Sequence, residues 1–138
     1  MPLEGIDHLD LVVSDLERAL GFYEALLAPL GYERTRDIEG EQGERIAYMS
    51  RAGSRGALGL REAHDGREQR RFDRYEIGVH HVCFGAPDRE AVDAVFAAGV
   101  EAGARVESAP REYDYTPGYY SAFLRDPDGI KLEVLHRP

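Results

Sequence analysis

The sequence is poor in cysteine, in basic residues and in long apolar runs. Cys83 is the single cysteine among 138 residues, which excludes an internal disulfide framework and is typical of a reducing compartment. Lys and Arg number 17 against 26 Asp and Glu, for a formal net charge of −9. Phosphates would repel such a chain, so we expect no nucleic-acid partner. No apolar run in the sequence reaches the length of a membrane span.

The first ten residues, MPLEGIDHLD, contain acids where a signal peptide would have bases and then a long apolar run. With the single cysteine, this predicts a cytoplasmic protein without a membrane partner. Hydrophobic residues make up 43% of the chain and charged residues 31%, enough for a core and a hydrated surface. A chain of this length forms one domain or two small, closely packed modules.

An internal repeat is the most informative pattern. The segment GIDHLDLVVSDLERALGFY at 5–23 aligns with GVHHVCFGAPDREAVDAVF at 78–96. The alignment places His8 on His81 and Asp15 on Asp88. Each copy is typical of a short strand followed by a helix.

Both helices have signals at their ends. For the first we predict a capping box of Ser14 and Glu17 and an end at Gly31. For the second we predict Asp88 as N-cap and an end at Gly103. The expected apolar stripes are Leu16, Leu20, Tyr23, Leu27 and Leu30 in the first helix, and Val92, Val95, Phe96 and Val100 in the second.

Three segments of strand character follow each helix. They are roughly 32–38, 45–50 and 57–62 in the first half, and 104–108, 119–125 and 130–136 in the second. The order strand, helix, three strands predicts an α+β fold of two βαβββ modules, at 1–63 and 78–138, joined by a charged connector at 64–77. Because one helix on a small sheet buries little apolar surface, we expect the two modules to pack together.

Strand parity points to a chemical site. His8, His81 and Glu133 each lie opposite the apolar face of their strands. If helices cover the apolar faces and the other faces curve toward each other, the three side chains converge. Two imidazoles and a carboxylate form a facial set for a divalent metal with open positions. Alone, a strand histidine is more often structural and a strand glutamate more often solvated. The recurrence of histidine at equivalent positions favours the metal.

Three stretches carry a resemblance: DHLDLVVSDLERALGFYEALLAPLGY, HHVCF and FLRDPDGIKLEV. With the two βαβββ halves they resemble the vicinal oxygen chelate superfamily, which includes glyoxalases, extradiol dioxygenases, epimerases, fosfomycin-modifying enzymes and metal-free bleomycin-binding proteins. The resemblance covers nearly the whole chain and implies an eight-stranded, open barrel-like cleft. It also implies homodimers, and a divalent ion such as Zn, Ni, Mn or Fe bound by His8, His81 and Glu133.

Two well-known activities of that superfamily match the sequence incompletely. Resemblance to lactoylglutathione lyases implies a fourth ligand, a carboxylate, where GALGLREA places Gly59, and Glu62 has the other parity. Extradiol dioxygenases match the His, His, Glu set. Resemblance to these enzymes implies a Tyr at the position of Phe123 and an acid–base His near the positions of Asp114 or Thr116. The reaction therefore stays open.

The segment EYDYTPGYY holds four tyrosines around a Pro-Gly turn. By strand parity Tyr119 and Ser121 face the same side as Phe123. Tyr115, Tyr119 and Phe123 are candidate substrate contacts, because aromatic rings stack on planar ligands and tyrosine donates to oxyanions. The tyrosines could equally pack the turn and a dimer surface. Arg61 is a candidate partner for an anionic substrate, although an exposed surface arginine is the commoner interpretation.

Two classes of function follow from these residues. The first is a glyoxalase-like metalloenzyme, a lyase, isomerase or dioxygenase-like protein. Its divalent ion would bind vicinal oxygens of a small substrate and stabilise an enolate or oxyanion, and Glu133 would double as a base if it dissociates from the metal. The second is a binding protein that sequesters an aromatic or glycopeptide-type antibiotic, as bleomycin-resistance proteins do.

Overall fold

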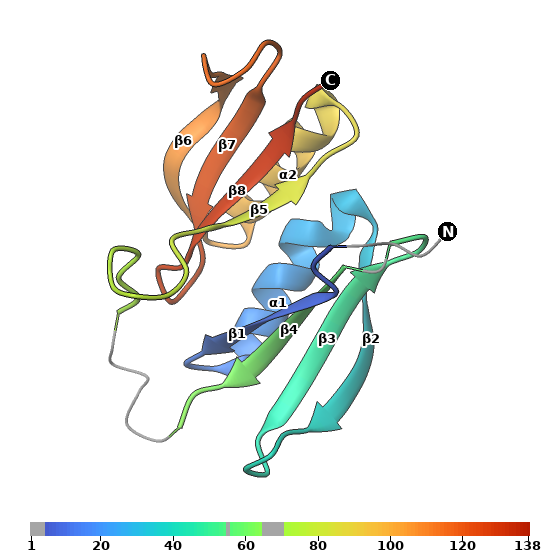
Figure 1. The fold of residues 1–138 in the computed structure, drawn as a ribbon, viewed down its shortest axis with the longest axis vertical. Helices are drawn as coiled ribbons and strands as arrows, with labels where there is room; N and C mark the ends of the chain where they lie inside the picture. The colour runs from blue at the N-terminus through green and yellow to red at the C-terminus, as the bar shows by residue number, and fades with distance from the viewer. Residues whose placement is uncertain (1–4, 55, 65–70) are drawn as a thin grey trace. The chain divides into compact units, whose positions relative to one another are not determined.

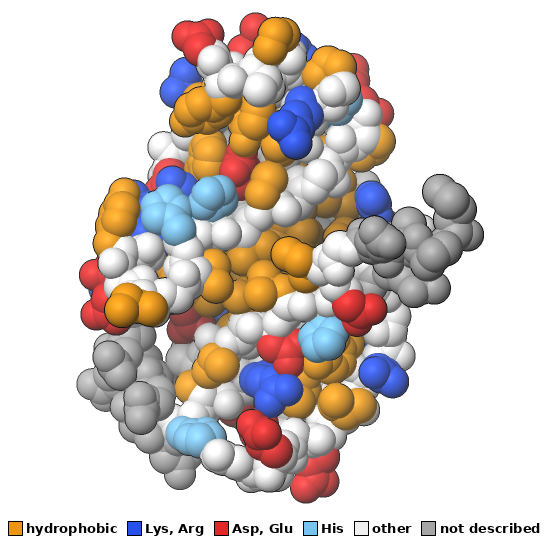
Figure 2. All heavy atoms as spheres, viewed as in Figure 1, with side chains coloured by type: hydrophobic (Ala, Val, Ile, Leu, Met, Phe, Trp, Pro, Cys, Tyr) orange, Lys and Arg blue, Asp and Glu red, His pale blue; other side chains and the backbone are white. Residues whose placement is uncertain are grey.

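The computed structural model describes residues 5–54, 56–64 and 71–138. It divides into two compact units, Met1–Arg70 and Arg71–Pro138. Each unit contains a strand, a helix and three further strands, which form one four-stranded sheet (Figure 1). The predicted α+β fold of two βαβββ modules is therefore confirmed. Acidic and basic side chains are interspersed between hydrophobic ones on the visible face (Figure 2).

In the first unit the sheet has the strand order β1-β4-β3-β2. β1 runs parallel to β4, and the other pairs are antiparallel. The elements are β1 (His8–Val13), α1 (Leu16–Leu27), the short 3-10 helix η1 (Ala28–Leu30), β2 (Tyr32–Glu39), β3 (Arg45–Arg51) and β4 (Ala57–Glu62).

The second unit repeats this topology with the order β5-β8-β7-β6. Its central strand β8 runs parallel to β5 and antiparallel to β7. The elements are β5 (Val82–Gly85), α2 (Arg89–Glu101), β6 (Arg105–Glu112), β7 (Tyr120–Arg125) and β8 (Lys131–His136). No helix in the described part of the chain is long and apolar enough to span a membrane.

A helix covers one face of each sheet, and the core of each unit lies between its helix and its sheet. α1 packs on β2 and β4, and α2 packs on β6, β7 and β8 (Figure 1). The predicted stripe of α1 and η1 is buried throughout. In α2, Val92 and Val95 are buried together with Gly99, but the prediction for Val100 was wrong, since 45% of it is exposed. The buried face of α2 thus includes Gly99 and not the adjacent Val100.

The helix ends correct one sequence prediction. α1 is capped by Asp15, whose Oδ1 accepts from the Arg18 backbone N–H at 3.0 Å. The predicted cap, Ser14, instead accepts at its Oγ from the Arg18 guanidinium. Asp15 is the residue with extended backbone before the first turn, which an N-cap requires. Asp88 caps α2 as predicted, by accepting from the Ala91 N–H at 2.8 Å.

The described residues include only part of the predicted connector at 64–77. Its residues 65–70 lie outside the described residues. Residues 71–77 form neither helix nor strand and belong to the second unit. The Phe72 N–H donates to the Asp128 carbonyl at 3.4 Å, and Arg74 donates to Glu107 on β6. This end of the connector is therefore anchored on the second sheet.

Candidate functional site

Glu133 is a buried carboxylate in the middle of the second sheet. Its neighbours Leu132 and Val134 point toward the α2 side and are buried, so Glu133 points to the opposite face. Only 4% of Glu133 is exposed. The register sets it between Cys83 on β5 and Phe123 on β7. Glu133 is therefore not a solvent-exposed strand residue, and its buried carboxylate requires polar partners.

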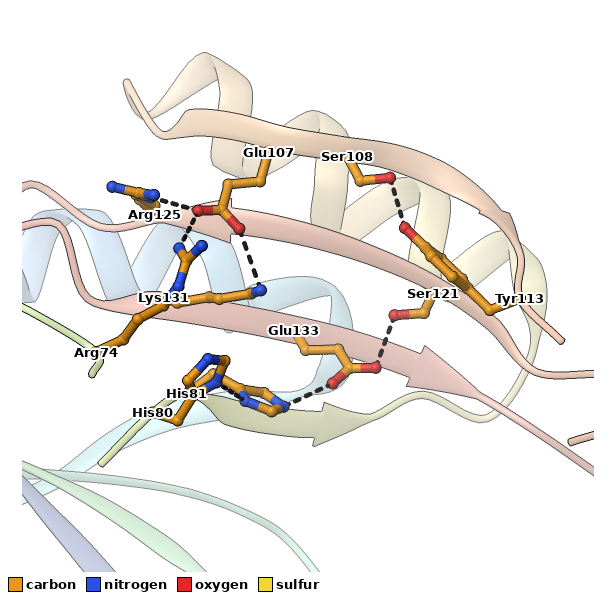
Figure 3. A network of polar contacts seen from close by, with 10 residues as sticks. All are labelled: Arg74, His80, His81, Glu107, Ser108, Tyr113, Ser121, Arg125, Lys131 and Glu133. Carbon is orange, nitrogen blue, oxygen red and sulfur yellow. Dashed lines mark hydrogen bonds and ion pairs between the residues drawn. The ribbon is translucent and has the colours of Figure 1, made fainter. Parts of the chain in front are cut away.

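Three side chains supply those partners. His81 Nε2 lies 3.0 Å from Glu133 Oε2, and the Ser121 hydroxyl donates to Oε1 at 2.9 Å (Figure 3). The Tyr119 hydroxyl donates to the same Oε1. Desolvation, together with this hydrogen bond to the carboxylate, raises the pKa of Tyr119 well above its ordinary value. Tyr119 therefore remains a protonated donor, which fixes one oxygen and leaves Oε2 facing His81.

The tautomer of His81 follows from its two contacts. An ionised carboxylate only accepts, so Nε2 of His81 must carry a proton when it bonds Glu133. Nδ1 of His81 then accepts from Nδ1 of His80, at 2.8 Å (Figure 3). The pKa of His80 is lowered, chiefly by desolvation and further by the nearby positive charges of Lys131 and Arg74. A neutral His80 suits this donor role.

Cys83 borders the same carboxylate. Although its side chain reaches solvent, the surrounding sheet desolvates the thiol. This desolvation, with the neighbouring Glu133 carboxylate, raises the pKa of Cys83 to about 12. The thiol therefore stays protonated at neutral pH, which makes it a poor nucleophile.

Aromatic rings gather beside the Glu133 and His81 pair. Tyr113 and Tyr115 stack with centroids 5.4 Å apart and planes 4° apart, and Tyr119 meets both edge-on. Phe123 contacts the Tyr113 ring at 5.7 Å and the His81 ring at 6.3 Å. The predicted residues Tyr115, Tyr119 and Phe123 thus belong to one cluster with His81 and Glu133. Tyr115, 67% exposed, forms its outer edge.

His8 occupies the equivalent place at the start of β1 in the first unit. Its Nδ1 lies 2.9 Å from Asp7 Oδ1, and its ring meets the Tyr48 ring edge-on at 5.9 Å. A carboxylate on Nδ1 orients the imidazole and assigns Nε2 to a metal or a ligand. In His81 the Nδ1 is likewise engaged, by His80, but Nε2 donates to Glu133, so Nε2 would have to give up this proton before it could bind a metal.

Arg61 is neither an exposed surface residue nor an uncompensated cation. Its Nε donates to Asp10 Oδ2 at 2.7 Å and its Nη1 to Glu44 Oε1 at 2.9 Å. The Tyr48 hydroxyl donates to the same Asp10 oxygen at 3.1 Å. Asp10 Oδ1 is buried, with no hydrogen-bond partner among the described residues. Two carboxylates thus compensate Arg61, which weakens its prediction as a partner for an anionic substrate.

Imidazole and carboxylate are groups that hold divalent metal ions in proteins. The second unit brings one of each together, His81 and Glu133, and hydroxyl donors orient Oε1 of the carboxylate. His81 and Glu133 lie together in the second unit, and His8 belongs to the first. Across the residues that the structure describes, no group of three His, Cys, Asp or Glu side chains forms a metal cage.

Several site residues were not predicted from the sequence. Asp10 and Tyr48 contact the position of Gly59, and His80 supports His81. The parity rule already placed Asp10 on the face of His8, two residues along β1, and would have singled it out. Tyr48 and His80 required the tertiary structure, because strand pairing and a ring contact bring them to the site.

Comparison with known proteins supports the fold and the family. The sequence model of the Glyoxalase/Bleomycin resistance protein/Dioxygenase superfamily matches residues 5–134. The uncharacterized protein YqjT of Bacillus subtilis is 29% identical over 129 residues, which cover 93% of this chain and 95% of YqjT. The crystal structure of a glyoxylase/bleomycin resistance protein/dioxygenase domain from Frankia sp. EAN1pec superposes with a TM-score of 0.82. The two sequences are 26% identical, and the match covers 99% of this chain and 100% of the Frankia chain.

A further solved structure shares the fold alone. It is TnmS3, an antibiotic binding protein from Streptomyces sp. CB03234, with a TM-score of 0.66 and 23% identity. The match covers 100% of this chain and 99% of TnmS3.

Proposed function

The chain belongs to the Glyoxalase/Bleomycin resistance protein/Dioxygenase superfamily, and on that premise we propose that it is a small metalloenzyme. His8, His81 and Glu133 would hold a divalent ion, Zn, Ni, Mn or Fe. The substrate would be a small molecule with vicinal oxygens. The single cysteine supports a cytoplasmic setting.

One observation carries this proposal: Glu133 is buried and paired with His81, with two hydroxyls oriented on its other oxygen. A carboxylate is costly to bury, and a stabilising core position would be filled better by an apolar side chain. A buried carboxylate paired with an imidazole is typical of functional sites.

The bound ion would act as a Lewis acid that polarises the vicinal oxygens and stabilises an enolate or oxyanion. The residues of the chain orient and protect this chemistry. Tyr119 and Ser121 hold Glu133 Oε1, so Oε2, which faces His81, is the oxygen that would hold the ion and, when Glu133 leaves the ion, would accept a substrate proton. The contacting rings of Tyr113, Tyr119 and Phe123 would limit the access of water on one side.

The first unit offers no fourth ligand at the position of Gly59. Asp10 and Tyr48 would meet any side chain placed there. Lactoylglutathione lyase chemistry, for which the resemblance implies a second carboxylate ligand at that position, is therefore disfavoured. A lyase, isomerase or dioxygenase-like reaction with three protein ligands is retained.

Elemental analysis tests the proposal directly. Protein purified without added metal or chelator is expected to contain about one divalent ion per chain, or to take one up on titration with a rise in melting temperature. Glu133→Gln should lose the ion, because it removes an anionic ligand while keeping the size of the side chain. Glu112→Gln, an exposed position on β6, is the matched control. No uptake by the wild type would overturn the proposal.

A second candidate function is capture of a planar ligand. This function is favoured by the stacked rings of Tyr113 and Tyr115. Arg111 Cζ also lies over the Tyr113 ring, 3.9 Å from its centroid. The chain has no tryptophan, and four of its eight tyrosines lie in the segment 113–120, so tyrosine emission is sensitive to this cluster. Titration with bleomycin-type and planar antibiotics should quench it, and less so in Tyr115→Ala than in the control Tyr32→Ala. Unchanged emission at saturating ligand would exclude this candidate.

We also propose that the protein is a two-fold homodimer. Within their sheets β1 and β2 are edge strands, as are β5 and β6. Exposed edges with unpaired backbone groups are usually covered in native proteins. An isologous contact between two copies would cover such an edge on both at once.

A further inference from the structure

Three cations surround one carboxylate on the second sheet. Arg74 and Arg125 both donate to Glu107 Oε1, at 2.5 Å each, and Lys131 Nζ lies 3.3 Å from Oε2 (Figure 3). Arg74 comes from the connector, Glu107 from β6, Arg125 from β7 and Lys131 from β8. Four separate segments thus bring these charges together, at side chains that are between 16% and 31% exposed.

The carboxylate does not neutralise the cluster. Arg74, Arg125 and Lys131 carry three positive charges against one negative charge on Glu107, in a chain whose net charge is −9. Burial alone would raise the pKa of Glu107. The hydrogen bonds from Arg125, Arg74 and Lys131 outweigh it and lower that pKa to about 2. Glu107 is therefore fully ionised at neutral pH, and two positive charges remain uncompensated within the cluster.

The cations also keep donors that Glu107 cannot use. A guanidinium has five N–H groups and an ammonium three, whereas the contacts to Glu107 engage one nitrogen of each cation. The Nε of Arg74 is buried without a hydrogen-bond partner among the described residues. A purely structural ion pair would leave neither excess charge nor unpaired donors on a partly buried face.

The cluster adjoins the candidate active site. Lys131 and Glu133 are two residues apart on the same face of β8, which separates them by roughly 7 Å. Lys131 Nζ also lies 4.7 Å from the centroid of the Phe123 ring. The cations therefore border the His81 and Glu133 pair on the side where β8 begins (Figure 3).

We propose that Arg74, Arg125 and Lys131 form an oxyanion subsite that binds a carboxylate or phosphate group of the substrate. This inference deepens the proposed function, on which its substrate assignment rests: the substrate is an anion whose charged group lies beside its metal-binding oxygens. Guanidinium groups match the paired oxygens of carboxylate and phosphate, and the lysine adds a point charge. Glu107 holds the three cations in place and competes with the bound anion for their N–H donors.

Anion binding is measurable without metal. Chelator-treated protein is melted in increasing inorganic phosphate, in acetate, and in sodium chloride at the same ionic strength. We expect phosphate or acetate to raise the melting temperature more than chloride does, and the stronger of the two identifies the preferred group. Equal effects of all three salts on the wild type would overturn the subsite. Metal uptake is measured separately, so failure of the subsite and failure of the metal site are distinguishable.

Two variants change the subsite in opposite directions. Lys131→Met should weaken phosphate or acetate binding by about tenfold, since it removes one charge-assisted contact. Glu107→Gln should strengthen binding, because three cations then lack an internal partner. If that variant is less stable, the anion should restore its melting temperature more than it raises the wild type. Arg89→Gln, which breaks the exposed pair with Glu112, controls for general charge effects. Weaker anion binding by Glu107→Gln would contradict the proposal.

Discussion

The Asp10 carboxylate occupies the space in which a side chain on Gly59 would begin. Asp10 Oδ1 lies 2.2 Å from the position of a Cβ added to Gly59, and Tyr48 Cε1 lies 2.7 Å from it. The strand register explains this closeness, because both Asp10 and Tyr48 are direct partners of Gly59. The absence of a fourth, carboxylate ligand at position 59 is therefore matched by two neighbours that fill its place.

A substitution at Gly59 tests this relationship. Gly59→Glu should lower the free energy of unfolding by about 1–3 kcal/mol, as overpacking of a closely packed position does. Gly85→Ala, where an added Cβ meets nothing within 4 Å, should have a much smaller effect. Adding Asp10→Gly to Gly59→Glu should recover part of the loss, as measured by urea denaturation. Independent, additive effects of the two substitutions would show that Asp10 does not block the position.

Glu107 makes stability depend on acid pH. Its folded-state pKa of about 2 lies below the ordinary value of 4.5, so the folded state binds this proton less tightly than the unfolded state does. The stabilisation is present above pH 4.5 and is lost as the pH falls toward 2, to the extent of about 3 kcal/mol. Glu107→Gln should flatten this part of the stability curve, measured by denaturation between pH 5 and 2. The exposed control Glu112→Gln should retain the wild-type slope.

The N-cap of α1 is a second local test. Asp15→Ala should reduce the free energy of unfolding by about 1 kcal/mol, because the Arg18 N–H loses its acceptor at the start of the helix. Ser14→Ala, at the residue first predicted as the cap, should cost less. Thermal melts followed by circular dichroism compare the two. A larger loss for Ser14→Ala would restore the capping box.

The proposed homodimer is tested by light scattering at micromolar concentration. A chain of 15.4 kDa should then scatter with twice that mass. Lysine substitutions at exposed apolar positions on edge strands, Val12 on β1 and Val106 on β6, should identify the contact, because a charge in an isologous interface meets its own copy. A strictly monomeric mass would contradict the dimer and remove the interface role of the Tyr113–Tyr120 segment.

The sequence by itself determined the elements and their repetition. Segments of strand character with apolar residues at alternate positions made the strands recognisable, and caps such as Asp88 marked the helices, because these signals act between near neighbours in the chain. Parity alone also placed Glu133 and His81 opposite the apolar faces. The fold class and the choice of candidate ligands therefore needed no long-range information.

Only the tertiary structure decided what surrounds those residues. Strand pairing put Ser121 and Tyr119 on Glu133, Asp10 over Gly59, and four segments around Glu107. Pairing register is a long-range property, set by which strands meet and where their bulges fall, as in the irregular pairing of β6 with β7. Parity tells which face a side chain takes, but the partners it finds there come from segments far away in the chain.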